Sequence, residues 1–469
     1  MNQKIQQFLH LKNIPLDLRT TTLLLMPLLI FFSYHPMLNI GQDHGMYFEI
    51  SLLEIYLVFF ALVNLPSIWR SRTALLKNRT VQFTFAFCAL TTLSLFWTTN
   101  LIKGILISGI VWLLFACFLS FLTYKNLKKL IPALSKILII SACLISIFAL
   151  FQIFAEIIGF PQNISLLCDG CTASQFGFAR VTGFSIEPQF FGSLLLVPIF
   201  LLFYKLTISK PNHKTILATT LLVAVLFLTM SRGAIYAFAV GIVVFIIINY
   251  RQVKKIIPPL TIATGSLILS LAVQGISADL NPRINIDFRT ATASTLHQLS
   301  LGIIDIRPKD NNATTPSDET PSPSEDPNAP IFDGYIEEST DIRAMLSELA
   351  LRTWSSSPTN IIFGVGIGGT GYALNKTFPD QISNTEIVQN QYVELLLENG
   401  LIGLIFFATL IVALFAATHK QKIFWTILAA FLIQWLFFSG LPNALHIYLT
   451  LALCIATSHL VAKYGTIKT

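Results

Sequence analysis

Charged residues are scarce in this sequence. Of its 469 residues, 12% are charged and 54% are hydrophobic, whereas soluble domains carry about a quarter charged residues. With a mean hydropathy of +0.68, the composition excludes an ordinary soluble protein and predicts an integral membrane protein. The apolar runs also lack a period-two alternation, which excludes a membrane β-barrel and leaves a polytopic all-α fold.

The apolar runs predict about 12 transmembrane helices. Each run is long enough to cross roughly 30 Å of hydrocarbon. The seventh and eighth runs are separated only if "SRG" at 231–233 is a turn, because one helix over 215–250 would be about 54 Å long. The runs lie near 21–39, 48–67, 80–98, 101–123, 130–158, 186–206, 215–231, 233–250, 256–276, 390–417, 421–438 and 441–461.

The order of these runs predicts three regions. Residues 1–276 form a nine-helix transmembrane region, 277–389 form one long extracytoplasmic loop between helices 9 and 10, and 390–469 form a three-helix transmembrane region. The basic N-terminus lacks a small-residue cleavage site after its apolar run, so we expect this run to be the first span and not a signal peptide. No convincing internal repeat is visible.

Charge predicts the orientation in the membrane. If both termini are cytoplasmic, 21 of the 31 basic residues lie on the inner side, whereas Asp17 is the only one of the 24 acidic residues there. This agrees with the positive-inside rule. The formal net charge of +7 therefore indicates contact with inner-leaflet lipids and no nucleic-acid partner.

Cysteine and histidine are too sparse to predict a metal site. Four of the six cysteines lie in spans, and Cys168 and Cys171 form "CDGC" in an outer loop, where we expect a local disulfide. A metal site there would need two further ligands. The eight histidines, His446 among them, form no visible ligand set, so we expect no metal and no cofactor.

The long loop has three parts. Residues 308–330 are acidic, proline-rich and of low complexity, which predicts disorder. A surface helix is expected around Ile342 to Leu349, from its helical spacing of apolar residues. The glycine-rich "GVGIGGTG" at 364–371 lacks the strand–helix context of a dinucleotide site. A flexible loop whose backbone amides approach an anion stays open as an alternative.

Two arginines stand out against the apolar sequence. Arg232 is the only charge between Thr215 and Tyr250, and it is either an interfacial anchor or an anion clamp near the outer membrane face. Arg180 and Glu187 precede the sixth span in "ARVTGFSIEP". Glu187 suits the N-terminal dipole of a helix, but that explanation leaves Arg180 without a role.

Polar residues also open the tenth span, in "VQNQYVELLLENGLIG". Asn390, Glu394 and Glu398 are four residues apart and share one helical face. They form either an interfacial polar stripe or a functional cluster, because carboxylates entering a transmembrane helix are costly unless they face a cavity or a partner. Arg343, on the loop helix, is an ordinary surface residue when taken alone.

Together these motifs resemble a known family. The combination of "RVTGFSIEP", "SRGA", a long outer loop carrying "GVGIGG", and "NQYVELLLENGLIG" is similar to the O-antigen ligase/polymerase superfamily. The resemblance implies an inverting, metal-independent membrane glycosyltransferase. Its donor is a saccharide on undecaprenyl diphosphate at the outer face of the bacterial cytoplasmic (inner) membrane.

The resemblance also implies residue roles. Arginines of the family hold the diphosphate leaving group, and Arg180, Arg232 and Arg343 match such positions. Ligases of the family carry a His-Asn pair at the start of the tenth span, where this sequence has Gln389 and Asn390. Glutamine cannot serve as a general base. Either a carboxylate is the base, with Glu187 and Glu394 as the catalytic candidates in that order, or bond breaking is driven mostly by stabilisation of the leaving group.

Three functions are compared. The first is a polymerase that joins lipid-linked oligosaccharide repeat units, and the second is a ligase that passes the glycan to lipid A core or another envelope acceptor. The third is a polytopic transporter, which would be expected to show internal repeats and mid-membrane charges. The loss of histidine favours the polymerase. Its expected partners are the polyprenyl-diphosphate-linked oligosaccharide, membrane lipids, and chain-length regulator or flippase proteins.

Overall fold

The structure is a computed structural model. It describes residues 16–43, 46–165, 180–281, 288–300, 304, 335–379, 382–418, 421–441 and 444–464. The "CDGC" cysteines and the insert 308–330 lie outside the described residues, so the disulfide and the disorder stay predictions.

Helices dominate the fold and a single two-stranded hairpin accompanies them within the described residues. The N-terminal half contains α2 (Leu18–Leu29), η1 (Ile30–Phe32), β1 (Met37–Asp43), β2 (Met46–Ser51), α3 (Leu52–Leu76), α4 (Arg79–Leu93), η2 (Ser94–Phe96), α5 (Leu101–Leu122), α6 (Leu127–Ile157), α7 (Gln162–Ser165) and α8 (Pro188–Ile208). The remainder contains α9 (His213–Leu228), α10 (Arg232–Asn249), η4 (Tyr250–Gln252), α11 (Val253–Leu280), α12 (Phe288–Leu299), α13 (Tyr335–Ser355), α14 (Pro358–Phe363), α15 (Thr370–Thr377), α16 (Gln391–Thr418), α17 (Lys422–Gln434) and α18 (Leu445–Tyr464).

The chain is a mostly helical, multi-pass membrane protein. Every one of the 12 predicted spans overlaps a helix. Of the helical segments described, 6 are long and apolar enough to cross a membrane, and four shorter apolar helices accompany them. The number of spans therefore stays a prediction. The predicted break between the seventh and eighth runs is confirmed, but it lies at 229–231, because α9 ends at Leu228 and α10 begins at Arg232, within the "SRG" predicted to be the turn.

The prediction of an exclusively helical fold missed the antiparallel hairpin of β1 and β2. Leu38 pairs with Ile50 and Gln42 pairs with Tyr47, with a register shift between Asn39 and Gly41. The strand β2 occupies the start of the run that we assigned to the second span. Its helix, α3, begins only after Ser51, whose side chain and that of Glu54 form a capping box.

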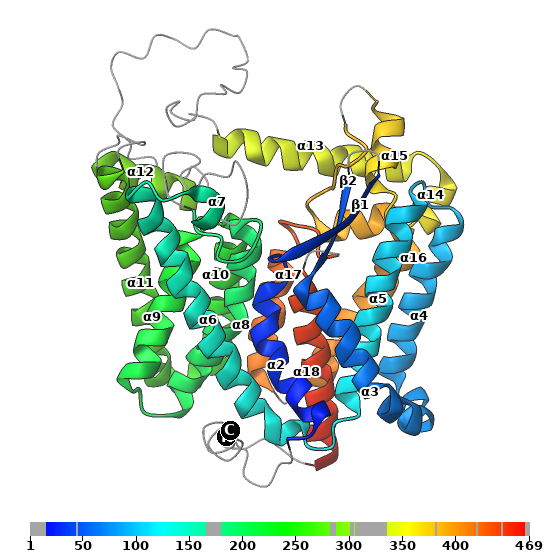
Figure 1. Cartoon of the computed structure of the whole chain (residues 1–469), viewed down its shortest axis with the longest axis horizontal. Helices are drawn as coiled ribbons and strands as arrows, with labels where there is room; N and C mark the ends of the chain where they lie inside the picture. Colours follow the sequence, from blue (N-terminus) through cyan, green and yellow to red (C-terminus); the bar gives the residue numbers. More distant parts are fainter. Residues whose placement is uncertain are drawn as a thin grey trace.

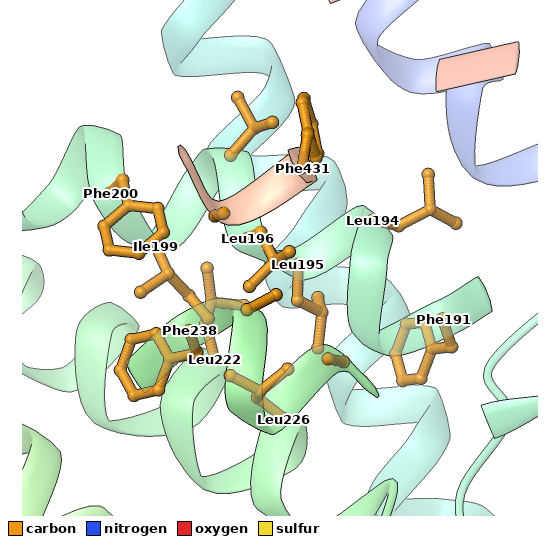
Figure 2. Packing of buried hydrophobic residues seen from close by; sticks show 14 of the residues in the cluster. Phe191, Leu194, Leu195, Leu196, Ile199, Phe200, Leu222, Leu226, Phe238 and Phe431 are labelled. Carbon is orange, nitrogen blue, oxygen red and sulfur yellow. The ribbon is translucent and has the colours of Figure 1, made fainter. Parts of the chain in front are cut away.

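The largest hydrophobic core surrounds α8. This helix is buried along most of its length and packs against α6, α9, α10, α11 and α17. Figure 2 shows its side chains Leu195, Leu196 and Phe200 interleaved with residues of its neighbours α9, α10 and α17. The start of α8 is thereby held among several helices that come from distant parts of the chain.

The irregular elements gather at one end of the helical bundle, which we call the loop end. Figure 1 shows the β1–β2 hairpin and α7, α12, α13, α14 and α15 at the top, with α13 lying across the bundle, while the end of α18 lies at the bottom. α13 packs against α14, α15 and α16. The predicted surface helix is thus confirmed as a helix, but one face of it is buried through Leu346, Leu349 and Ala350.

Candidate active site at the loop end

Arg343 connects three distant segments at the loop end. Its Nε donates a hydrogen bond to Oε1 of Gln389, at 3.0 Å, just before α16 begins. Its Nη2 donates to Oε1 of Gln189, at 3.4 Å, in the first turn of α8. Gln189 in turn donates from Nε2 to the backbone oxygen of Phe437, at 2.8 Å, after α17 ends. Arg343 is therefore not an ordinary surface residue, since it joins α13 to the starts of α8 and α16.

Arg232 is the first residue of α10 and is buried. Ser231 caps the helix, with its side chain accepting a hydrogen bond from the backbone N–H of Ala234. A guanidinium at a helix N-terminus adds to the positive end of the helix dipole, so both attract an anion. The neighbouring Gly233 lies against the Phe437 side chain, which a Cβ would approach to 2.7 Å. The start of α10 thus adjoins the segment that binds Gln189.

Arg180 lies on a short non-helical segment before α8 and is half-buried. The next residue, Val181, donates its backbone N–H to the backbone oxygen of Leu228, at 3.3 Å. Leu228 is the last residue of α9, four positions before Arg232. Two of the three arginines implied by the family resemblance therefore lie on adjoining segments.

Asn390 has a structural role at the start of α16. Its Oδ1 accepts hydrogen bonds from the backbone N–H groups of Tyr392, at 3.1 Å, and Val393, at 3.3 Å. This is the arrangement of a helix N-cap. The structure thus accounts for the Asn390 side-chain oxygen without a ligand, and substrate binding by Asn390 stays a prediction.

Glu394 and Glu398 are both buried, but their surroundings differ. Glu398 accepts a hydrogen bond from the hydroxyl of Thr370, at 2.9 Å, and the backbone N–H groups of Gly368 and Thr370 also donate to its carboxylate. Oε2 of Glu394 has no hydrogen-bond partner among the described residues. Within the described residues, the two carboxylates therefore differ in that one oxygen of Glu394 is left without a hydrogen bond.

The backbone N–H groups of the glycine-rich segment 364–371 are paired within the protein: those of Gly368 and Thr370 donate to the Glu398 carboxylate. The backbone N–H of Val365 donates to the backbone oxygen of Leu397, and that of Gly366 donates to the backbone oxygen of Glu398. The backbone N–H of Ile367 donates to Oγ of Ser94. Gly366 has a φ of +89°, and a Cβ on it would lie 2.4 Å from Cα of Thr98. The glycines therefore permit close backbone packing against the α4–α5 turn and α16, and the anion that the segment contacts is the protein's own Glu398 carboxylate.

The tenth predicted span is not one continuous helix, because α16 breaks at Gly400. This residue has φ 63° and ψ −167°, a conformation that is essentially restricted to glycine. A Cβ on Gly400 would lie 2.3 Å from the backbone oxygen of Ile362. Glu394 and Glu398 consequently lie on a short helical segment at the loop end, and 401–418 forms the longer apolar part.

Glu187 occupies the N-cap position of α8, and Pro188 follows at the first helical position. Its side chain makes no capping hydrogen bond and is exposed. The predicted role as a helix start is thus confirmed for the backbone only. The exposed carboxylate stands two residues before Gln189, the residue that contacts Arg343.

Backbone strain is concentrated beside these residues. Within the part of the chain that the structure describes, two non-glycine residues have positive φ, Met230 at 50° and Gln389 at 54°. Met230 precedes the Ser231–Arg232 start of α10, and Gln389 precedes the Asn390 cap of α16. Such outliers are unfavourable and cluster at functional sites, which favours a functional interpretation of both turns.

The order of these elements matches a known family. Residues 217–408 match the family model described as O-antigen ligase. This confirms the resemblance to the O-antigen ligase/polymerase superfamily. The matched part contains Arg232, Arg343, Gln389, Asn390 and Glu394. It begins after Arg180 and Glu187, and a comparison with curated proteins finds no match.

The match to this family supports a glycan-transferring enzyme of the cell envelope that acts in the membrane on lipid-linked glycans. The matched residues form the part of the site that the α9–α10 turn, α13 and the start of α16 contribute. The start of α8 and the segment around Arg180 complete the site from outside the matched residues.

Two glutamines that were not singled out from the sequence, Gln189 and Gln391, hold elements together at the loop end by hydrogen bonds. Gln391 donates its backbone N–H to the backbone oxygen of Trp435, at 2.9 Å. Its Oε1 accepts from the backbone N–H of Gly440 and, at 3.3 Å, from the hydroxyl of Tyr448. Together with Gln189, it ties α8 and α16 to the connection between α17 and α18. The only signal in the sequence was an amide side chain beside an apolar run.

His446, which belongs to no ligand set visible in the sequence, has a buried polar partner. Its Nε2 lies 2.7 Å from Oγ of Ser193, and both residues are buried between α18 and α8. Nothing in the sequence connects these two residues, which are 253 positions apart.

Proposed function

We propose that this protein is a polysaccharide polymerase that joins undecaprenyl-diphosphate-linked oligosaccharide repeat units at the outer face of the bacterial cytoplasmic membrane. The observation that carries this proposal is the hydrogen bond from Arg343 to Gln389. At the position where the family resemblance implies the histidine base of a ligase, this chain has a residue that orients a cation. A polymerase without that base fits this arrangement better than a ligase does.

The proposed reaction is an inverting transfer. An acceptor hydroxyl oxygen attacks the anomeric carbon of the donor sugar, and the bond between that carbon and the phosphate oxygen breaks. The diphosphate leaves with the electron pair, and the hydroxyl proton passes to a carboxylate. Arg180, Arg232 and Arg343 hold the leaving diphosphate, since fixed cations stabilise the charge that develops on it.

Glu394 is the favoured base in this proposal. It lies one helical turn after Asn390, and its Oε2 has no hydrogen-bond partner within the described residues. Glu187 is the second candidate, because its exposed carboxylate lies close along the chain to Gln189. We expect Glu394→Gln to lower the rate at least 100-fold, since general bases contribute about 10²–10⁴-fold. Initial rates of lipid-linked repeat consumption by the purified enzyme would measure this.

Glu187→Gln serves as the companion variant. If it loses the activity while Glu394→Gln keeps it, the base is Glu187. If both variants keep normal rates, neither carboxylate is the base, and the stabilisation of the leaving group provides the catalysis.

Two alternatives remain in view. A ligase would carry the same arginines, and the family description supports it directly. A transporter is disfavoured, because the charged residues discussed here gather at the loop end and the break in α16 lies there too. The break at Gly400 is packed against backbone of the α14 region, which differs from a helix break that lines a substrate site.

A comparison of envelope glycans separates these functions. Surface and lipid-linked glycans from the native host would be resolved on gels with the gene intact, deleted, or carrying Arg232→Ala. We expect deletion and Arg232→Ala to leave single repeat units and no long chains, with the variant expressed normally. Arg352→Ala is the matched control, because Arg352 is exposed and pairs with Glu348 on its own helix.

Each other outcome has a defined meaning. Long chains that persist on the lipid carrier after deletion would identify a ligase. Unchanged glycans after deletion would contradict both enzymes, and normal long chains from Arg232→Ala would contradict the diphosphate clamp.

A further inference from the structure

Gln152, near the end of α6, forms hydrogen bonds through both ends of its side-chain amide to the end of α7 and to the segment that follows Arg180. It is 1% exposed. Its Oε1 accepts hydrogen bonds from the backbone N–H groups of Thr182 and Gly183, both at 3.0 Å. Its Nε2 lies within donating distance of the backbone oxygens of Ser165 and Gly183, both at 3.0 Å, and of Oγ1 of Thr182, at 3.1 Å. Apart from the contact with Ser165 at the end of α7, these contacts use both ends of the amide on the residues that follow Arg180.

The backbone after Arg180 is also held from two other directions. Val181 donates to the backbone oxygen of Leu228 at the end of α9. Gly183 has a φ of +58°, and a Cβ on it would lie 2.8 Å from Cε2 of Phe191 in α8. The segment 180–183 is therefore fixed between α6, α8 and α9, with Gln152 as its polar anchor.

Simple packing does not explain this glutamine. α6 is an apolar helix of 31 residues, and a polar side chain within such a helix is costly unless it serves a partner. An unpartnered buried polar group is tolerated in the same helix, since Oγ of Ser146 has no hydrogen-bond partner among the described residues. Gln152 differs because it replaces the hydrogen bonds that a non-helical segment lacks, and that segment carries a cation.

We propose that Gln152 is a positioning residue that fixes Arg180 beside the α9–α10 turn, so that Arg180 and Arg232 hold the same diphosphate. This inference rests on the proposed function, because that function supplies the diphosphate. Gln152 itself does not touch the substrate. It acts through the backbone of Thr182 and Gly183.

The test is the binding of undecaprenyl diphosphate to the full-length protein purified in detergent. We expect Gln152→Met, which keeps the length of the side chain but removes its hydrogen bonds, to weaken binding about tenfold, or about 1.4 kcal/mol. In an Arg180→Ala background the same substitution should cause no further loss, because residues that act through one another are not additive. Ser146→Ala, on the same helix, should bind as the unmodified protein does.

A second variant approaches the same segment from the opposite side. Gly183→Ala leaves Gln152 intact but places a Cβ against Phe191, so it should reproduce the loss and should also have no effect when Arg180 is alanine. This variant replaces Gln152→Met in the test if that protein does not fold.

The outcomes separate this inference from the proposed function. Normal binding by Gln152→Met, or an equal loss with and without Arg180, would overturn the positioning role. Weak binding by Arg232→Ala but normal binding by Arg180→Ala would also overturn it, while leaving the clamp in place. Normal binding by both arginine variants would overturn the diphosphate site itself.

Discussion

The two arginines of α13 show how contacts distinguish side chains of the same type. Arg343 bonds to Gln389 and Gln189, whereas Arg352 is exposed and pairs with Glu348 one turn away. Hydrogen bonds of charged groups contribute about 1.5–3 kcal/mol, so we expect Arg343→Ala to lower polymer synthesis at least tenfold. Arg352→Ala should have little effect, since exposed pairs of this kind contribute only about 0.3–0.5 kcal/mol.

Polymer yield from cells carrying each variant, normalised to the amount of protein in the membrane, checks this prediction. Normal yields from both variants would mean that Arg343 is as dispensable as Arg352 and would contradict its role in the site. A loss in both would point to the folding of α13 and not to the charge of Arg343.

The residue types of the candidate site could be predicted from the sequence, but their partners could not. Arg232 and Glu394 are noticeable because charge is costly in an apolar run. The role of Arg343 depends on residues 46 and 154 positions away, and no local pattern carries that information. Glu394 and Glu398 share one helical face, yet only the fold reveals that the hydroxyl of Thr370 donates a hydrogen bond to the carboxylate of Glu398.

The break in α16 depends on a single glycine. At φ 63° and ψ −167°, an alanine would be strained by about 1–3 kcal/mol from the backbone alone, and its Cβ would overlap backbone atoms of Ile362 and Phe363. We expect Gly400→Ala to lower the thermal unfolding temperature in detergent by several degrees or to abolish accumulation of the protein. Fluorescence-detected size exclusion after heating measures both effects.

Gly265→Ala is the matched control. Gly265 is in the interior of α11, and a Cβ there would meet no atom within 4 Å, so alanine should leave the stability unchanged or raise it by up to about 1 kcal/mol. If Gly400→Ala were as stable as Gly265→Ala, the break in α16 would not be required for folding.

Apolar run length predicted the helices well but not their ends or interruptions. Hydropathy averages over a window, so it joins β2 to α3 and continues through Gly400. The hairpin of β1 and β2 had a local signal in the sequence, because the polar stretch "GQDHG" at 41–45 separates two short runs that contain apolar residues. That signal was outweighed by the longer apolar run beside it.

The overall arrangement depends on the charge asymmetry of the loops, which the sequence contains, and on the packing order of the helices, which it does not. Charge asymmetry predicts which loops share a side, and the contacts at the loop end bring Arg343, Gln189 and Gln389 together there. The order in which helices pack, with α8 at the centre of the core, follows from shape complementarity between distant segments. No count of apolar or basic residues contains that information.

The orientation of the whole molecule is the remaining prediction. We expect the loop end to face outward and the basic loops to face the cytoplasm. In a protein with Cys168 and Cys171 changed to serine, an impermeant maleimide applied to intact cells should label Thr359→Cys, which lies in α14 at the loop end. It should label Lys210→Cys, in the basic connection between α8 and α9, only after the inner membrane is permeabilised. Both positions are exposed, so accessibility within the fold does not separate them. The reverse labelling pattern would place the arginines on the cytoplasmic side, where they could not act on a glycan carried in the outer leaflet.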